Sequence, residues 1–145
     1  MRGLDVYNFQ QNDILNALLD GLTEGYDFLV KDEEIISNKL HFDSQKPLTS
    51  VLKEFKDSGE SYYVSFIQIQ AFPKGTAVSE ICNYQDYLNS SCEFVLMIID
   101  GLYAEFYAKK TDNILKMIQN FEGVKAEKIE IKTDWSDGRV RFELW

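Results

Sequence analysis

The sequence predicts an α+β fold: a mostly antiparallel, twisted sheet of about six or seven strands, with three or four helices packed mainly on one face. Several segments repeat apolar residues at steps of three and four and are apolar on one side only, so each of these helices must cover another layer. The stretch from Phe94 to Lys109 instead has six apolar residues, an Asp-Gly pair and then alternating polarity, which is typical of a β-hairpin. With 145 residues, 45% of them hydrophobic, and no repeat or linker, the chain is predicted to form a single domain over residues 1–145.

Three helices are predicted from apolar spacing and from residues that favour helix ends. A fourth, shorter helix is predicted in the segment that follows the longest strand. In chain order, the helices run from Asn12 (the N-cap) to Gly21 or Gly25, from Pro47 to Ser58-Gly59, from Asn83 to about Asn89, and from Thr111 or Asp112 to Gly123.

The strands are predicted from β-branched and aromatic runs and from alternating polarity. Besides the hairpin, they are expected at Gly3–Tyr7, Tyr26–Val30, Tyr62–Phe72, Ile129–Ile131 and Val140–Leu144, the last two pairing through a turn at Asp137-Gly138. We expect Asp32-Glu33-Glu34 to form an exposed turn with Asp32 at its tip, after which Glu34–Ile36 returns as a further strand.

Asp100, at the end of the most hydrophobic strand, has two interpretations. In the first, Asp100-Gly101 forms a two-residue type I′ turn, so that Ile99 faces Leu102, Met97 faces Ala104 and Val95 faces Phe106. In the second, Asp100 holds a metal ion in a phosphoryl-transfer site. That chemistry needs a phosphate-binding loop, and neither GxxxxGK[ST] nor GxGxxG occurs in the sequence. We therefore interpret Asp100 as a turn residue.

The net charge of −9 is concentrated near the N-terminus. Residues 1–45 contain nine acidic and three basic residues, which gives a net charge of −6. Such a field repels phosphate backbones and favours a basic protein partner, although negative charge also keeps a small protein soluble. The longest apolar run, Phe94–Ile99, is too short to span a bilayer, and no signal peptide is evident, so a cytoplasmic protein that binds neither membrane nor nucleic acid is expected.

Residues suited to catalysis are few. His41 is the single histidine, Cys82 and Cys92 lack CxxC spacing, and no serine lies in a GxSxG motif. No catalytic residue, metal ligand or cofactor site is therefore predicted. The remaining enzymatic or ligand-binding alternative is a site assembled from distant residues such as His41, Cys82 and the tyrosines.

Side chains suited to partner binding are more numerous. Tyr103, Glu105 and Tyr107 are expected on one face of the hairpin, and the alternating C-terminal strands add charged and aromatic residues if they join the same sheet. Aromatic residues and arginine are enriched at the centres of interfaces, whereas a solvated sheet face also carries mixed charges. The predicted function is a protein-binding or inhibitory, immunity-like module. Its candidate residues are Tyr103, Glu105, Tyr107, Arg139, Arg141, Trp145, Asp32, Glu33 and Glu34.

Whole segments of the chain resemble family 2691 of the domains of unknown function, found in Bacillus-type bacteria. The resemblance extends mainly over residues 60–145. It implies a small stand-alone protein and assigns no activity, cofactor or catalytic residue. The segments that carry it are Ala71–Gly75, Tyr84–Cys92, Phe94–Asp100, the Tyr103 and Tyr107 pair with Lys109, and Asp137–Arg139 with Trp145.

Overall fold

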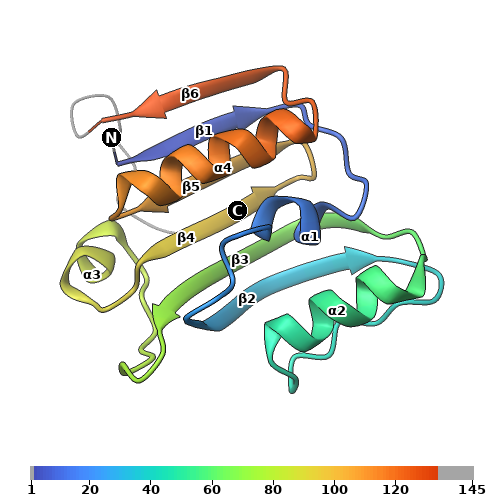
Figure 1. The fold of residues 1–145 in the computed structure, drawn as a ribbon, viewed down its shortest axis with the longest axis horizontal. Helices are drawn as coiled ribbons and strands as arrows, with labels where there is room; N and C mark the ends of the chain where they lie inside the picture. Colours follow the sequence, from blue (N-terminus) through green and yellow to red (C-terminus); the bar gives the residue numbers. More distant parts are fainter. Residues whose placement is uncertain (1, 134–145) are drawn as a thin grey trace.

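The computed structural model describes residues 2–133, which form one six-stranded antiparallel sheet with four helices (Figure 1). The strand order is β2-β3-β4-β5-β1-β6, and every neighbouring pair is antiparallel. The predicted α+β class is confirmed. The predicted strand at Val140–Leu144 lies outside the described residues. In chain order the elements are β1 Gly3–Tyr7, α1 Ile14–Leu19, β2 Tyr26–Ile36, α2 Leu48–Ser58, β3 Tyr63–Pro73, α3 Tyr84–Asn89, β4 Phe94–Ile99, β5 Tyr103–Ala108, α4 Thr111–Gly123 and β6 Lys128–Lys132.

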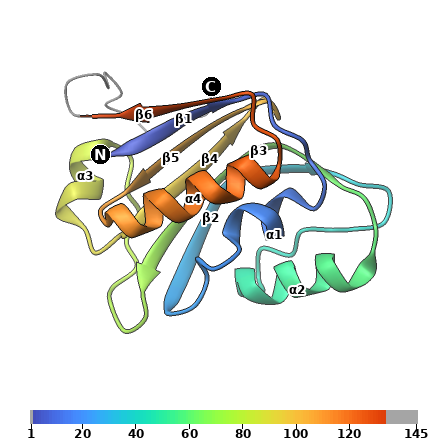
Figure 2. The same ribbon diagram turned by 45° about the horizontal axis from the view of Figure 1, so that its top comes forward.

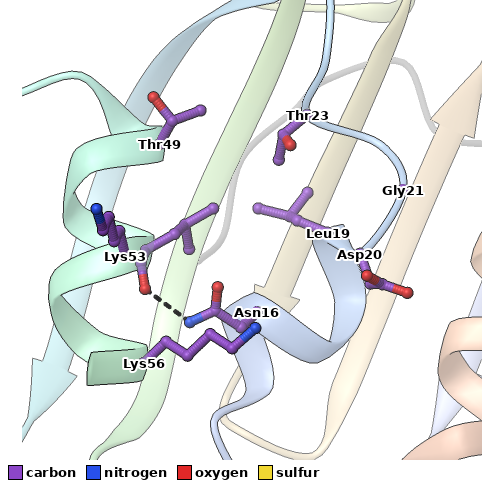
Figure 3. A pocket seen from close by; sticks show the side chains of 9 residues that line it. Asn16, Leu19, Asp20, Gly21, Thr23, Thr49, Lys53 and Lys56 are labelled. Atoms are coloured by element: carbon purple, nitrogen blue, oxygen red, sulfur yellow. Dashed lines mark hydrogen bonds between the residues drawn. The ribbon is translucent and has the colours of Figure 1, made fainter. Parts of the chain in front are cut away.

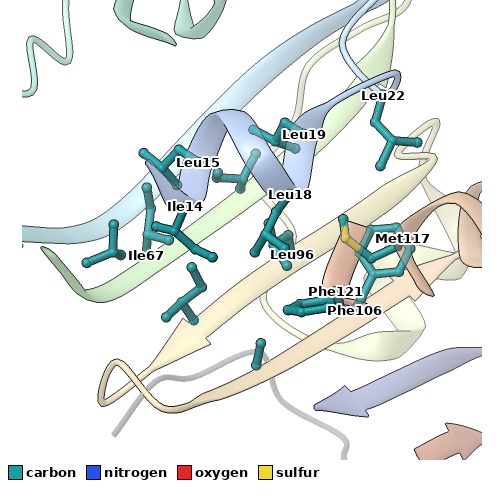
Figure 4. Close-up of a cluster of buried hydrophobic side chains, with 14 of the residues drawn as sticks. Ile14, Leu15, Leu18, Leu19, Leu22, Ile67, Leu96, Phe106, Met117 and Phe121 are labelled. Carbon is teal, nitrogen blue, oxygen red and sulfur yellow. The ribbon is translucent and has the colours of Figure 1, made fainter. Parts of the chain in front are cut away.

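Helices α1, α2 and α4 lie side by side on one face of the sheet, as both ribbon views show (Figures 1 and 2). Their apolar stripes pack against the sheet in one large core, in which Leu18 of α1, Phe121 of α4 and Phe106 of β5 are fully buried (Figure 4). We call the sheet surface under these helices the helix face. Helix α3 packs on the opposite face, where its Tyr87 joins a second, smaller core with Val95 and Met97 of β4.

The β4–β5 hairpin forms at the predicted position, but its predicted register is wrong by one residue. Asp100 and Gly101 both have the positive φ expected of the turn, 55° and 71°. However, Ile99 pairs with Tyr103, so the loop contains three residues rather than two. Consequently Leu96 and Phe106 pair on the helix face, whereas Val95 pairs with Tyr107, and Met97 with Glu105, on the opposite face.

The predicted turn at Asp32-Glu33-Glu34 is also wrong, because β2 does not reverse there. Glu34 still pairs with β3, opposite Phe66, and the register shifts between Lys31 and Glu34. Asp32 has a φ of 55°, a conformation that acidic and amide side chains tolerate better than most. The segment is therefore a β-bulge inside one long strand, which places its extra residues at the sheet edge.

Helix α1 has only six residues, and side-chain hydrogen bonds tie its N-terminal end to the residue before β3 and to α2. The Tyr62 hydroxyl donates to the Asp13 carboxylate and accepts the backbone N–H of Leu15 at 3.0 Å. The Asn16 amide donates to both Asp13 and the Leu52 carbonyl of α2. These bonds position a helix too short to be stable by itself.

Candidate functional site

The sheet face opposite the three helices contains a buried group of charged and phenolic side chains, which we call the Lys132 cluster. The Lys132 ammonium lies 2.8 Å from the Glu105 carboxylate, 2.8 Å from the Asp5 carboxylate and 2.7 Å from the Tyr107 hydroxyl. The Tyr103 hydroxyl donates to Asp5 at 2.7 Å. Burial and this hydrogen bond raise the pKa of Tyr103 well above its usual range, so its phenol stays protonated.

A glycine in the intervening strand leaves room for these contacts. Gly3 of β1 lies between Tyr107 of β5 and Lys132 of β6 in one cross-strand row. Adjacent strands are about 4.8 Å apart, so the Lys132 side chain must extend across β1 to reach β5. A Cβ atom at residue 3 would lie 2.2 Å from the Phe106 carbonyl oxygen. The close backbone packing and the contacts of the cluster therefore both require that residue 3 has no side chain.

The hairpin residues predicted to bind a partner belong to this cluster. Glu105 and Tyr107 are only 3% and 0% exposed, and Tyr103 is half-buried. They share a face with β6 as expected, but in this structure they contact Lys132 and Asp5 of the protein itself. Their partner-binding role remains a prediction. The other C-terminal candidates, Arg139, Arg141 and Trp145, lie outside the described residues.

The acidic candidates Asp32, Glu33 and Glu34 are exposed on the outer strand of the sheet. Strand β2 pairs with β3 on one side, and no other strand of residues 2–133 pairs with its outer side. Partial burial raises the pKa of the Glu33 carboxyl, and the charge of nearby His41 opposes this shift. Two further exposed acidic residues lie toward the N-terminal end of the strand, Asp27 within β2 and Glu24 just before it. We call this set the acidic edge: Glu24, Asp27, Asp32, Glu33 and Glu34.

An exposed apolar pair lies at the C-terminal end of the acidic edge. Ile36 of β2 and Tyr63 of β3 pair across the strands and are 59% and 39% exposed. Within the described part of the chain, no basic side chain forms an ion pair with the acidic edge, and the ammonium of the nearby Lys31 pairs with Glu80 at 2.8 Å. The edge thus combines acidic side chains that form no ion pair among these residues with an apolar contact surface.

Residues proposed for a dispersed catalytic site are not brought together by any contact among residues 2–133. His41 is exposed in the loop after β2, near Glu33. Cys82 is exposed before α3, whereas Cys92 is buried and contacts the Phe94 carbonyl oxygen. Burial raises the pKa of the Cys92 thiol to about 12, so it is not a nucleophile at neutral pH.

A groove between α1 and α2 was not predicted from the sequence (Figure 3). It encloses about 280 Å³. The apolar side chains of Leu19 and Leu52 line it, with hydroxyl groups at one end and two lysines on the α2 side. These polar residues are Thr23, Thr49, Lys53 and Lys56. No sequence signal identifies the groove, because its two walls come from helices that lie about 30 residues apart in the chain.

The structure thus defines a small α+β protein with an acidic sheet edge, a buried ionic cluster and a groove in its helical layer. The family model described as "Protein of unknown function (DUF2691)" matches residues 1–143, and the chain belongs to this family. The match includes the N-terminal third, beyond the segments that suggested the family. The chain is also 29% identical over 122 residues to the uncharacterized protein YncE of Bacillus subtilis (strain 168), covering 84% of this chain and 79% of that protein. No solved structure matches the chain.

Among the helices of residues 2–133, none has both the length and the apolar character that crossing a bilayer requires.

Proposed function

We propose that this protein is a binding module that docks a basic protein partner through the acidic edge of β2. The observation that carries the proposal is the placement of four exposed acidic residues in the outer strand β2 and a fifth, Glu24, just before it, without ion-pair partners among residues 2–133. Opposite charges on two surfaces accelerate association and select the partner, and the effect weakens with salt because the Debye length is about 8–10 Å at physiological ionic strength.

The Ile36 and Tyr63 pair supports the same surface. Interfaces combine an apolar or aromatic centre with a polar rim, and here a tyrosine and an isoleucine adjoin the acidic bulge. The proposed partner therefore has basic side chains around at least one apolar side chain. An immunity-like protein that inhibits a basic enzyme would bind such a partner, and the acidic charge of this chain favours that function.

Acidic residues and bulges at a sheet edge also have a purely protective effect, because they prevent uncontrolled pairing with other strands. The experiment must therefore separate specific docking from protection. Tagged protein is used to capture partners from lysate of the native host at low ionic strength. The charge-neutralised variant D32N/E33Q/E34Q is compared with D57N/D112N/E122Q, which removes three exposed acidic charges elsewhere in the described chain.

The proposal expects a captured protein of basic isoelectric point whose purified form rebinds the wild-type chain and dissociates as salt is added. Binding should weaken strongly in the bulge variant and change little in the control variant. If no basic protein rebinds, or if both variants lose binding equally, the proposal is wrong. Increased self-association of the bulge variant alone would assign the acidic edge to protection.

A further inference from the structure

We propose that the groove between α1 and α2 binds a small organic anion, with the anionic group at Lys56 and the apolar part over the floor formed by Leu19 and Leu52 and along the lysine stems. This site is separate from the acidic edge and does not depend on the function proposed for it. Its volume of about 280 Å³ is near the lower end for ligand pockets, so the ligand is a small molecule rather than a peptide.

The charge of the groove is the first argument. The chain has a net charge of −9, yet Lys53 and Lys56 both line this groove and neither forms an ion pair within the described residues. The one acidic residue in the lining, Asp20, points away from the groove in Figure 3 and pairs with Lys116 of α4 at 3.5 Å. The groove is therefore locally positive on an acidic protein, and this favours an anion.

The arrangement of the walls is the second argument. Figure 3 shows Lys56 extending from α2 toward α1, whereas the ammonium of Lys53 lies on the side of α2 away from α1, and Thr49 and Thr23 lie near the other end of the groove. Leu19 and Leu52 are 1% and 5% exposed, so they form a floor that is held rigidly in the core, and the aliphatic stems of Lys53 and Lys56 add most of the accessible apolar surface. Asn16 fixes the two walls relative to each other by donating to the Leu52 carbonyl at 2.8 Å. Hydrophobic walls with a few convergent polar groups are typical of ligand sites.

Exposed lysines on an amphipathic helix also occur without any ligand, and Lys56 lies in the last turn of α2, where a positive charge is favourable. The chain provides a matched control. Lys74 and Lys125 are exposed, lie outside the groove and likewise form no ion pair among residues 2–133. The variants K53Q/K56Q and K74Q/K125Q therefore change the net charge equally but only the first changes the groove.

The experiment is a titration of the ¹⁵N-labelled full chain, followed by amide chemical shifts at low ionic strength, with three probes. Hexanoate has a charge and an apolar chain, 1-hexanol has only the apolar chain, and inorganic phosphate has only the charge. We expect hexanoate to bind most tightly, with shifts centred on α1 and α2. Its affinity should fall roughly tenfold in K53Q/K56Q and less than about twofold in K74Q/K125Q.

Three results would overturn the proposal. These are no saturable binding of hexanoate, equal affinity for hexanol or phosphate, and equal losses in the two lysine variants. Circular dichroism and thermal unfolding of both variants verify that they remain folded, since these exposed lysines make no buried contact. If the acidic-edge experiment fails while hexanoate binds as expected, the groove assignment stands independently.

Discussion

The Lys132 cluster makes the sharpest prediction about stability, through the substitution Lys132→Met. Methionine keeps most of the length of the side chain but removes the ammonium, which contacts two carboxylates and a phenol at 2.7–2.8 Å. The side chains of Lys132 and Glu105 are only 6% and 4% exposed, and that of Asp5 is 19% exposed. Water therefore cannot replace the lost contacts at Glu105.

The size of the effect follows from this burial. Removing one partner of a buried ion pair destabilises a protein by about 3–5 kcal/mol, because the other charge stays buried without compensation. Small domains have a free energy of unfolding of about 5–15 kcal/mol, so the variant should lose a large part of its stability. The double variant K132M/E105Q should recover at least about 1 kcal/mol relative to K132M, because it removes the most buried carboxylate charge.

Urea unfolding followed by circular dichroism measures these differences, and an unchanged m-value verifies that the unfolding transition is the same. Lys128→Met is the matched control, since Lys128 lies on the same face of the same strand but is 62% exposed and pairs with the exposed Glu130. It should hardly change the stability. If K132M is no less stable than K128M, or if K132M/E105Q is less stable than K132M, the charge compensation inferred from the structure is wrong.

Three further predictions concern other parts of the fold. In the native protein at pH 8, a thiol reagent should modify Cys82 quickly and Cys92 only after unfolding. Because burial raises the pKa of the Cys92 thiol from 9.0 to about 12, the contribution of this thiol to stability should be fully present below pH 9 and be lost as the pH rises toward 12. Urea unfolding measured against pH should show this loss in the wild-type protein and not in Cys92→Ser. Tyr62→Phe should lower the free energy of unfolding by about 1–3 kcal/mol, since a buried backbone N–H of α1 loses its acceptor, and an unchanged urea midpoint would contradict this reasoning. Gly3→Ala should lower the thermal midpoint, because the clash with a backbone carbonyl reduces the free energy of unfolding by about 1–3 kcal/mol. Gly123→Ala is the control and should not lower the midpoint, since its new methyl group meets no atom within 4 Å. Equal midpoints would refute the account of Gly3.

Much of the fold could be predicted from local patterns. Helix α2 runs from Leu48 to Ser58 as its apolar spacing and the Pro47 and Gly59 signals indicate, and α4 ends at Gly123 as expected. Asp100 and Gly101 adopt the positive φ values that the Asp-Gly pair favours. Each of these features depends on residues within a few positions of one another, so it can be predicted from the local sequence alone.

The candidate sites were predictable only in part. The acidic residues of β2 were identified, but their bulge was mistaken for a turn because nothing local shows that β3 is long enough to pair on both sides of Asp32. The groove depends on how α1 and α2 pack, which no spacing rule gives. The charged residues of the C-terminal strands were expected on the face of Tyr103 and Tyr107 only if those strands joined the same sheet, and the structure shows that Lys128, Glu130 and Lys132 of β6 do share this face.

The sequence by itself determined where the helices lie, where most of the strands lie, where the hairpin turns, and that negative charge is concentrated near the N-terminus. Only the tertiary structure decided the hairpin register and the burial of Glu105. A register that buries a carboxylate is unfavourable when the hairpin is considered alone. It becomes acceptable because Lys132, 27 residues further along the chain, places its ammonium 2.8 Å from that carboxylate.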